Sequence, residues 1–506
     1  MQECINDLFE LGLQNDKLSL LYLENQNAQI AVKRNQRISR RTTIHNVIMQ
    51  GTVWGSLFCT ASMEKLGKSE YCRPDLLYKY KSKVDVPSLG MIDDVLKIQK
   101  CSVKSVNANA FTNAFIEGKK LNFSKSKCHR LHVSKRKDDG LNCAPLKVHD
   151  VEMKNSSKEK YLGDIIDETG KIRATVEERK NRGFAISSEI MSILEEIPLG
   201  SHRMEIGLHL RQAMLLNGIL YNSEVWHSLS EAEVNSLERV DEHLLRALVK
   251  AHSKTPVEFL YLESGAVPIR FIIMSRRILY LQVLLQRDDN ELTKKIYETQ
   301  KENPSKGDFS ELVNSDLKYL SDHLTESYIK SRSSAALKTE IKTLIRKKAL
   351  EYLSKKQSEH SKIRSIKYSQ LEAQRYIVSP LFTNEEVSVL YALRSRMIRT
   401  KVNFPSNHQS LACTLCQSHI DDQQHILHCK VIATQFASKY ASRNSCTYSD
   451  IFSENVHKQK EIAHLFVKLL KIRETNLDNI DANPSNSPEL LKCNVDLHSC
   501  IDNCSL

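Results

Sequence analysis

The chain has 506 residues, which is enough for several domains with cores of their own. Its 73 Lys and Arg against 61 Asp and Glu leave a net charge of +12, which suits a polyanionic partner without reaching a histone-like excess. Only 15 Gly and 11 Pro argue against a low-complexity protein and against a sandwich or propeller with many tight turns, so long helices are expected.

The 13 cysteines follow no short-period framework, and residues 1–4 lack the basic start and apolar core of a signal peptide. No apolar run approaches the length that spans a bilayer. These features predict an intracellular protein with reduced thiols, in the nucleus or the cytoplasm, and with no membrane partner.

The first part of the chain mixes short helical and strand patterns. Residues 4–23 predict two short helices separated by Gly12, and residues 28–33 alternate like a strand. Gln50-Gly51 stands between a strand-like run and an apolar helix, and glycine there lets a ligand or another backbone approach closely. A basic cluster precedes Gln50 in the chain and is either a solvated loop or a phosphate-binding loop. It consists of Lys33, Arg34, Arg37, Arg40 and Arg41.

Residues 89–98 place Asp93 and Asp94 between two short apolar runs, which predicts a β-hairpin with the acidic pair at its tip. Residues 77–81 alternate aromatic and basic side chains and predict a strand just before it. Carboxylates are ligands of Mg²⁺, and two such ions about 4 Å apart can clamp the oxygens of a phosphoryl transfer. An acidic pair alone also fits an ordinary polar turn, so its meaning depends on its neighbours.

The next elements alternate between helix and strand. Residues 105–118 predict a helix, and a strongly basic segment around Lys127 leads to a strand at residues 131–133. After a polar loop, residues 160–166 predict another strand, which ends in a turn at residues 167–170.

The order of these motifs resembles the palm of reverse transcriptases, specifically those of non-LTR retrotransposons. Four motifs in the right order at fitting spacing are more specific than any one of them. The matching residues are Gln50-Gly51, then Met91-Ile92-Asp93-Asp94, then Lys127 with Lys125 as its alternative, and finally Tyr161-Leu162-Gly163.

The resemblance implies an RNA-directed DNA polymerase that binds an RNA template and a DNA primer, or an RNA–DNA duplex, together with deoxynucleotides. By that resemblance Asp93 and Asp94 would hold Mg²⁺, and Lys127 would protonate the leaving pyrophosphate. Gln50 and Gly51 would shape the pocket around the incoming nucleotide and the template. Tyr161, Leu162 and Gly163 would form the primer grip.

One departure from the family is large. Its polymerases carry a third catalytic Asp on an earlier strand, whereas residues 1–4 resemble the helix that follows that strand. The fingers and the first carboxylate strand are therefore expected to be missing, as in an N-terminally truncated copy. Because the metals would lack their bridging carboxylate, the chain alone is expected to be inactive as a polymerase. The alternative is a non-catalytic, zinc-containing nucleic-acid-binding remnant.

From residue 173 onward the patterns are helical. Residues 204–220 form a strongly apolar helix pattern, Ser230 is a candidate N-cap of the next helix, and residues 268–286 predict another. By resemblance this region would be the thumb that holds the product duplex. Residues 286–310 are charged and contain Pro and Gly, which predicts a linker.

A helix at residues 337–353 has one apolar and one basic face. Such a charge run is either a solvated surface or a contact for RNA. The basic face consists of Lys338, Lys342, Arg346, Lys347 and Lys348.

Cys413, Cys416, His425 and Cys429 follow the spacing C-x2-C-x8-H-x3-C. Zn²⁺ prefers four tetrahedral nitrogen and sulfur ligands, and this spacing supplies two from one tight turn and two from a helix or turn. The alternative is a set of unrelated thiols, and His419 and His428 are competing nitrogen donors. The arrangement resembles the C-terminal CCHC element of non-LTR retrotransposon proteins, and the site would be structural.

Basic residues just before these ligands favour a module that faces nucleic acid. They are Arg394, Arg396, Arg399 and Lys401.

The predicted fold class is α+β: a partial polymerase palm with an antiparallel sheet and helices, then a mostly helical thumb and C-terminal region with a small zinc module. The predicted domains are fingers and palm at 1–170, thumb at 171–290, a basic helical connector at 291–405, the CCHC element at 406–432, a terminal helix at 433–475 and a disordered tail at 476–506.

Overall fold

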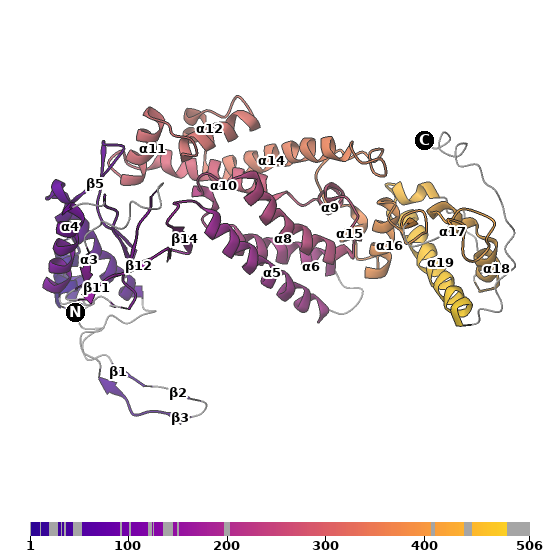
Figure 1. Cartoon of the computed structure of the whole chain (residues 1–506), viewed down its shortest axis with the longest axis horizontal. Coiled ribbons are helices and arrows are strands. Elements are labelled where there is room, and N and C mark those ends of the chain that lie inside the picture. Colours follow the sequence, from indigo (N-terminus) through magenta and orange to yellow (C-terminus); the bar gives the residue numbers. More distant parts are fainter. Residues whose placement is uncertain are drawn as a thin grey trace. The chain divides into compact units, whose positions relative to one another are not determined.

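The structure is a computed structural model. It describes residues 2–10, 12–19, 29–31, 33–34, 37–43, 53–91, 94–100, 103–119, 124, 126–134, 145–148, 151–196, 203–405, 410–439 and 448–482. Within these ranges the protein is mixed α and β and mostly helical, with small two-stranded sheets (Figure 1). The α+β class is confirmed at this level.

The chain divides into two compact units, each assembled from several segments. Unit 1 comprises Met1–Gly183, Asn217–Arg239 and Ile269–Ile345. Unit 2 comprises Phe184–Leu216, Val240–Pro268 and Arg346–Leu506. Three long helices contribute residues to both: α5 (Arg173–Glu195), α8 (Glu231–Val249) and α14 (Ser334–Gln357). The predicted division into six domains stays a prediction.

Unit 1 begins with helices that pack around one buried carboxylate. Helix α1 (Gln2–Glu10) lies against α3 (Val53–Tyr71), the helix that was predicted to follow Gln50-Gly51. The fully buried Asp7 of α1 pairs with Lys65 of α3 at 2.7 Å and with Lys119 at 2.6 Å. Lys119 directly follows α4 (Val103–Gly118), which confirms the helix predicted at residues 105–118.

Within the described residues, the strands of unit 1 form separate pairs rather than one large sheet. Antiparallel pairs join β1 (Gln29–Ile30) to β4 (Thr42–Thr43), β2 (Lys33–Arg34) to β3 (Arg37–Ile38), β5 (Tyr78–Tyr80) to β6 (Val84–Val86), β7 (Leu89–Met91) to β8 (Asp94–Leu96), β10 (Lys147–Val148) to β11 (Val151–Glu152), and β13 (Lys158–Tyr161) to β14 (Asp164–Asp167). β9 (His129–Leu131) pairs with β12 (Lys154–Ser156) in parallel.

Three strand predictions can be compared with these pairs. The strand predicted at residues 77–81 is confirmed as β5. The strand predicted at residues 131–133 lies two residues earlier, at His129–Leu131. Pairing with β12 over Lys154–Ser156 sets these bounds. The single strand predicted at residues 160–166 is instead part of a hairpin, since the chain turns between Tyr161 and Asp164.

The helical part of unit 1 centres on α10 (Ile269–Gln286), which starts directly after Pro268 as predicted. Its buried residues include Ile273, Ile278 and Leu281, and it contacts α11 (Leu292–Glu302), α12 (Phe309–Leu320) and α13 (Glu326–Ser331).

The linker predicted at residues 286–310 is wrong, because α11 occupies its middle. The side chain of Tyr297 is buried, its ring meets Phe309 edge-on at 6.0 Å, and its hydroxyl donates to Glu326 at 2.6 Å. The buried Tyr297 ring packs this helix against its neighbours. The charged residues around it made the segment resemble a linker in the sequence.

Ser230 caps α8 as predicted. Its hydroxyl accepts from the backbone N–H of Glu233, and the Glu233 carboxylate accepts from the Ser230 N–H at 2.7 Å. This reciprocal pair is a capping box that satisfies two otherwise unpaired backbone donors.

In unit 2, the helix predicted at residues 204–220 begins as α6 (Arg203–Leu210) and widens into a π-helical turn over Arg211–Leu216, before α7 (Asn217–Ile219). Arg211 is buried in that turn and pairs with Asp241 at 2.5 Å. A wider turn is a common way to aim one side chain out of helical register.

A second buried charge ties together segments far apart in the sequence. Glu263, in α9 (Val257–Ser264), is fully buried and accepts two hydrogen bonds from Arg394, at 2.8 and 2.9 Å. It also accepts from the hydroxyls of Tyr368 and Tyr376 at 2.5 Å. Tyr376 lies in α15 (Arg375–Val378), and Arg394 is the last residue of α16 (Asn384–Arg394).

The last helix, α19 (Val456–Ala482), packs against α16 and against the 3-10 helix η5 (Tyr448–Phe452). It ends later than the predicted terminal helix at 433–475, so residues 476–482 of the predicted disordered tail are helical. Asn476 shows why: its side chain donates to the Ile472 carbonyl at 2.8 Å and to Gln435 at 3.0 Å. Residues 483–506 lie outside the described part of the chain.

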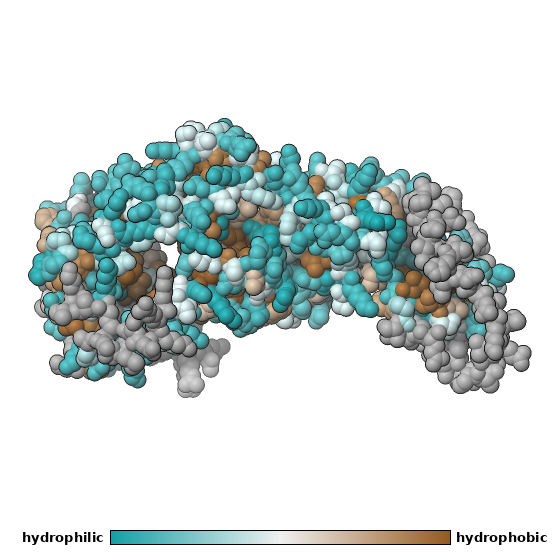
Figure 2. Space-filling model, turned by 45° about the horizontal axis from the view of Figure 1, so that its top comes forward, coloured by the Kyte–Doolittle hydropathy of each residue, from teal (hydrophilic) through white to brown (hydrophobic). Residues whose placement is uncertain are grey.

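The face drawn in Figure 2 is mostly hydrophilic, and its hydrophobic side chains show in scattered patches. No helix in the described ranges combines the length and apolar character that a membrane crossing requires.

Candidate metal centre

The four predicted zinc ligands come together in unit 2. The ligand atoms of Cys413, Cys416, His425 and Cys429 all lie within 4.8 Å of one another. The Cys413 and Cys429 sulfurs are 4.0 Å apart, and the Cys416 sulfur is 3.3 Å from the His425 Nε2. Tetrahedral zinc with Zn–S bonds of about 2.3 Å would place two sulfurs about 3.8 Å apart. The cluster therefore fits a four-coordinate ion.

Local turns place the first two ligands. An isolated antiparallel bridge joins Ala412 to Ile420, and the Cys413 N–H donates to the His419 carbonyl at 2.8 Å. Gln417, with φ 53°, closes the turn after Cys416 in the left-handed region. The chain thereby folds back tightly enough for both sulfurs to face the same point.

Helix α17 (Gln423–His428) places the other two. The Asp422 side chain caps it by accepting from the His425 N–H at 2.7 Å. Cys429 directly follows its last residue, and the next helix, α18 (Lys430–Lys439), begins at once. His425 and Cys429 are one helical turn apart and so lie on one side of this element.

At two of the sulfurs burial outweighs the hydrogen bonds that favour the thiolate. Burial raises the pKa of Cys413 to about 12, against hydrogen bonds from the Cys416 and Leu415 backbones that lower it. Burial also raises the pKa of Cys429, again opposed by backbone hydrogen bonds, from Ile432 and Val431. Backbone donors aimed at buried sulfurs stabilise thiolates, and a bound metal removes the repulsion between them.

Cys416 differs because it is less buried. Burial acts to raise its pKa, but hydrogen bonds from Ser418 and His419 and the nearby His425 outweigh this and bring the pKa to about 6. It is the sulfur most ready to lose its proton.

The competing nitrogen donors are not part of the cluster. His428 is exposed, and His419 is exposed with its ring stacked on His425 at a centroid distance of 5.2 Å. The structure thus favours His425, as the spacing predicted.

A buried carboxylate anchors the module to its helical neighbours. Asp421 is fully buried, accepts from the Lys401 N–H at 2.8 Å and pairs with Arg473 of α19 at 2.7 Å. Lys401 also donates from its side chain to the Ala412 carbonyl at 2.7 Å. The role of Asp421 was not predicted from the sequence. The pair Asp421-Asp422 beside the zinc ligands was the one feature that could have indicated it.

The predicted polymerase residues are only partly described. Gln50, Gly51 and Asp93 lie outside the described residues. Asp94 is the first residue of β8, where it is exposed and pairs in register with Met91. Lys127 is exposed in a turn, and within the described ranges no hydrogen bond or ion pair joins it to Asp94.

The predicted primer-grip residues form the tip of a hairpin. Leu162 and Gly163, at φ 46° and 91°, make the two-residue turn between β13 and β14. Positive φ at both positions is the type I′ arrangement that matches the twist of a hairpin. The buried Arg179 donates to the Gly163 carbonyl at 2.8 Å, and Asn222 donates to the Leu162 carbonyl at 3.2 Å.

This hairpin touches the acidic hairpin. The Tyr161 hydroxyl donates to the Leu89 carbonyl in β7 at 3.2 Å. Burial and the nearby Asp94 charge both raise the pKa of Tyr161. Two motifs about 70 residues apart in the sequence are therefore neighbours in space.

Helix α3 supports the acidic hairpin from another side. Its Glu70 is buried and accepts from the Ser88 N–H at 2.6 Å and from Lys97 at 2.5 Å. Ser88 precedes β7 and Lys97 follows β8, so the helix holds the open end of the hairpin, opposite the tip that was predicted to carry the acidic pair.

Of the basic residues just before the zinc ligands, Arg394 does not face solvent. It is buried and bound to Glu263, so its predicted place on a nucleic-acid-facing surface is wrong. Arg396 and Arg399 are exposed. A buried guanidinium keeps its charge only beside a partner, and Glu263 supplies that partner.

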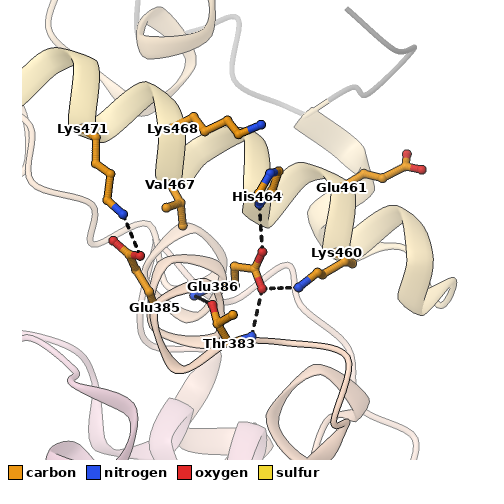
Figure 3. Close-up of a pocket in the computed structure, with 9 residues that line it drawn as sticks. All are labelled: Thr383, Glu385, Glu386, Lys460, Glu461, His464, Val467, Lys468 and Lys471. Carbon is orange, nitrogen blue, oxygen red and sulfur yellow. Dashed lines mark hydrogen bonds and ion pairs between the residues drawn. The ribbon is translucent and has the colours of Figure 1, made fainter. Parts of the chain in front are cut away.

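A cavity of about 580 Å³ lies between α16 and α19 (Figure 3). Its charged groups satisfy one another: Glu386 accepts from Lys460 and from His464, and Glu385 pairs with Lys471 at 2.9 Å. The Glu386 carboxylate also accepts from the Thr383 N–H in a capping box. These contacts hold the two helices together.

Comparison with known proteins does not identify the chain: no family model, no curated protein and no solved structure matches it.

Proposed function

We propose that the chain is a nucleic-acid-binding protein related to the reverse transcriptases of non-LTR retrotransposons, with a structural zinc centre. Its ligands would be RNA, or an RNA–DNA duplex of template and primer. The observation that carries the proposal is the Tyr161–Leu89 contact, which brings the primer-grip-like hairpin against the Asp-bearing hairpin. A contact between these two hairpins is expected in a polymerase palm, whereas two unrelated turns would not be expected to touch.

The packing of α3 on the acidic hairpin supports the same proposal. In the family the helix after Gln-Gly borders the nucleotide pocket, and here the corresponding helix binds both flanks of β7 and β8 through Glu70. The surplus of positive charge over the whole chain is of the sign that a phosphate backbone requires.

Zinc would be held by Cys413, Cys416, His425 and Cys429. With four protein ligands and three of them buried, the centre leaves no open position and would stabilise the module rather than catalyse a reaction. The module would then be a rigid part of the nucleic-acid-binding surface.

The experiment is a binding titration at several salt concentrations with labelled RNA, DNA and an RNA–DNA duplex. Each phosphate neutralised releases counterions, so the logarithm of the affinity should fall linearly with the logarithm of salt concentration, by about 0.7 to 0.9 per contact. No binding at low salt, or an affinity that ignores salt, would rule the function out.

Polymerase chemistry is the second candidate, favoured by the same hairpin contact. Mg²⁺, held by Asp93 and Asp94, would polarise the phosphates of an incoming deoxynucleotide, and Lys127 would supply a proton to the leaving group. Primer extension on an RNA template separates this candidate from binding alone. Synthesis that disappears in Asp94→Ala would establish it, while no synthesis by either chain under binding conditions would leave binding as the function.

A further inference from the structure

Four basic side chains of unit 2 lie near one another, and one of them lies over an aromatic ring. They come from three separate segments: the connection between α8 and α9, the turn after α14, and the residues after α16. They are Lys254, Lys362, Arg396 and Arg399, and the ring is Phe404. This group is named the Phe404 cluster below.

Direct contacts join Lys254 and Lys362 to the cluster, while Arg396 and Arg399 lie close enough for their charges to act on Lys362 and His252. The Lys254 ammonium lies 5.4 Å from the centroid of Phe404, and the His252 ring meets the same ring at 4.7 Å. Lys362 donates to the Asn403 side chain at 2.8 Å and lies 3.6 Å from the Met397 sulfur. Segments about 150 residues apart thus meet at one surface.

Among the residues that the structure describes, three of the four cations of the cluster form no ion pair. Within the described part of the chain, no carboxylate pairs with Lys254, Arg396 or Arg399, although all three are exposed. Arg246, which also lies near, is balanced by Glu242 at 2.8 Å. The cations act on one another as well: burial lowers the pKa of Lys362, and the charges of Lys254 and Arg396 lower it further.

Backbone geometry adds an independent observation. Arg396 has φ 53° at the end of α16, where the Met397 N–H reaches back to the Ala392 carbonyl at 2.8 Å. Lys250 has φ 52° at the end of α8, in a similar turn. Glycine is the residue best suited to this position. In both turns this position, just beyond the helix, is instead held by an exposed cation.

We propose that Lys254, Lys362, Arg396 and Arg399 bind the phosphates of a single-stranded nucleic acid, with Phe404 as the ring on which a base stacks. This inference rests on the proposed function and names the surface at which the nucleic acid would bind. A phosphate backbone would supply the negative charge that the cluster lacks. Cations around a half-buried aromatic ring are the combination that single strands need, because they offer both a charged backbone and free base faces.

The test compares two variants of the full chain with the same change in charge. One is Lys254→Gln, Arg396→Gln and Arg399→Gln combined. The matched control combines Lys306→Gln, Lys318→Gln and Lys330→Gln, three exposed lysines of unit 1. Circular dichroism and zinc content check that both variants keep their fold.

The probe is a fluorescent single-stranded RNA of mixed sequence. We expect the cluster variant to bind at least tenfold more weakly and its salt slope to fall by about 2, since three phosphate contacts of about 0.7 each are lost. The control should stay within about twofold of the parent chain.

Phe404→Leu separates stacking from charge. It should weaken binding by about fivefold or more with an unchanged salt slope, because an apolar side chain remains but the ring is gone. Equal weakening by the cluster and control variants, or a cluster variant that binds like the parent, would overturn the assignment while leaving the proposed function intact. A parent chain that binds no nucleic acid would overturn both the assignment of the Phe404 cluster and the proposed function.

Discussion

The hairpin tip at Leu162 and Gly163 shows what single residues can and cannot reveal. The two residues alternate with their neighbours like a strand, and Leu-Gly is a weaker turn signal than Asn-Gly or Asp-Gly. The turn becomes evident only from contacts that the sequence does not display, such as Arg179 on the Gly163 carbonyl. The zinc ligands are the opposite case, because their geometry follows from local spacing alone.

Two glycines of unit 1 provide a prediction at this scale. Gly163 has φ 91°, and a Cβ there would lie 3.0 Å from the Tyr221 ring, so Gly163→Ala should destabilise the protein by about 1 kcal/mol or more. Gly67, inside α3, has nothing within 4 Å of a new Cβ, so Gly67→Ala should be neutral or stabilise by up to about 1 kcal/mol.

Urea denaturation of the two variants beside the parent protein measures this difference. The midpoint of Gly163→Ala should be lower and that of Gly67→Ala equal or higher. The reverse order would show that the turn at Leu162 and Gly163 is not as described.

At the scale of elements, hydrophobic periodicity predicted the long helices and missed what depends on distant partners. The helices α4, α8 and α10 follow from their apolar faces and caps. Helix α11 was hidden because its segment is charged and its buried side chains, Lys294, Tyr297 and Thr299, include only one aromatic residue. The π-helical turn begins at Arg211, whose partner Asp241 lies 30 residues further along the chain.

The Glu263 network explains a further limit. Its partners Tyr368, Tyr376 and Arg394 lie 105, 113 and 131 residues away in the sequence. An arginine next to a zinc motif is typical of a surface that binds nucleic acid, and only the fold reveals that Arg394 balances a buried carboxylate. Arg396, two residues later, is exposed and belongs to the Phe404 cluster.

At the scale of the whole molecule, charge and motif order led to the proposed function, and the structure adds contacts between motifs. The positive net charge indicates a polyanionic partner but does not show which surface binds it. The Tyr161–Leu89 contact joins two motifs of the palm-like part, and the Phe404 cluster collects cations that the sequence scatters. Neither contact could be predicted from spacing, because each depends on how separate segments fold together.

Zinc is the claim that one measurement tests most directly. The full chain, purified from cells supplied with zinc, should contain one zinc ion at the four ligands, and a chelator should lower its thermal stability. Cys413→Ser should lose both the metal and the stability that comes with it. Cys72→Ser, which changes an exposed free cysteine of unit 1, should keep both. A parent chain without zinc, or a Cys413→Ser chain as stable as the parent, would contradict the zinc centre.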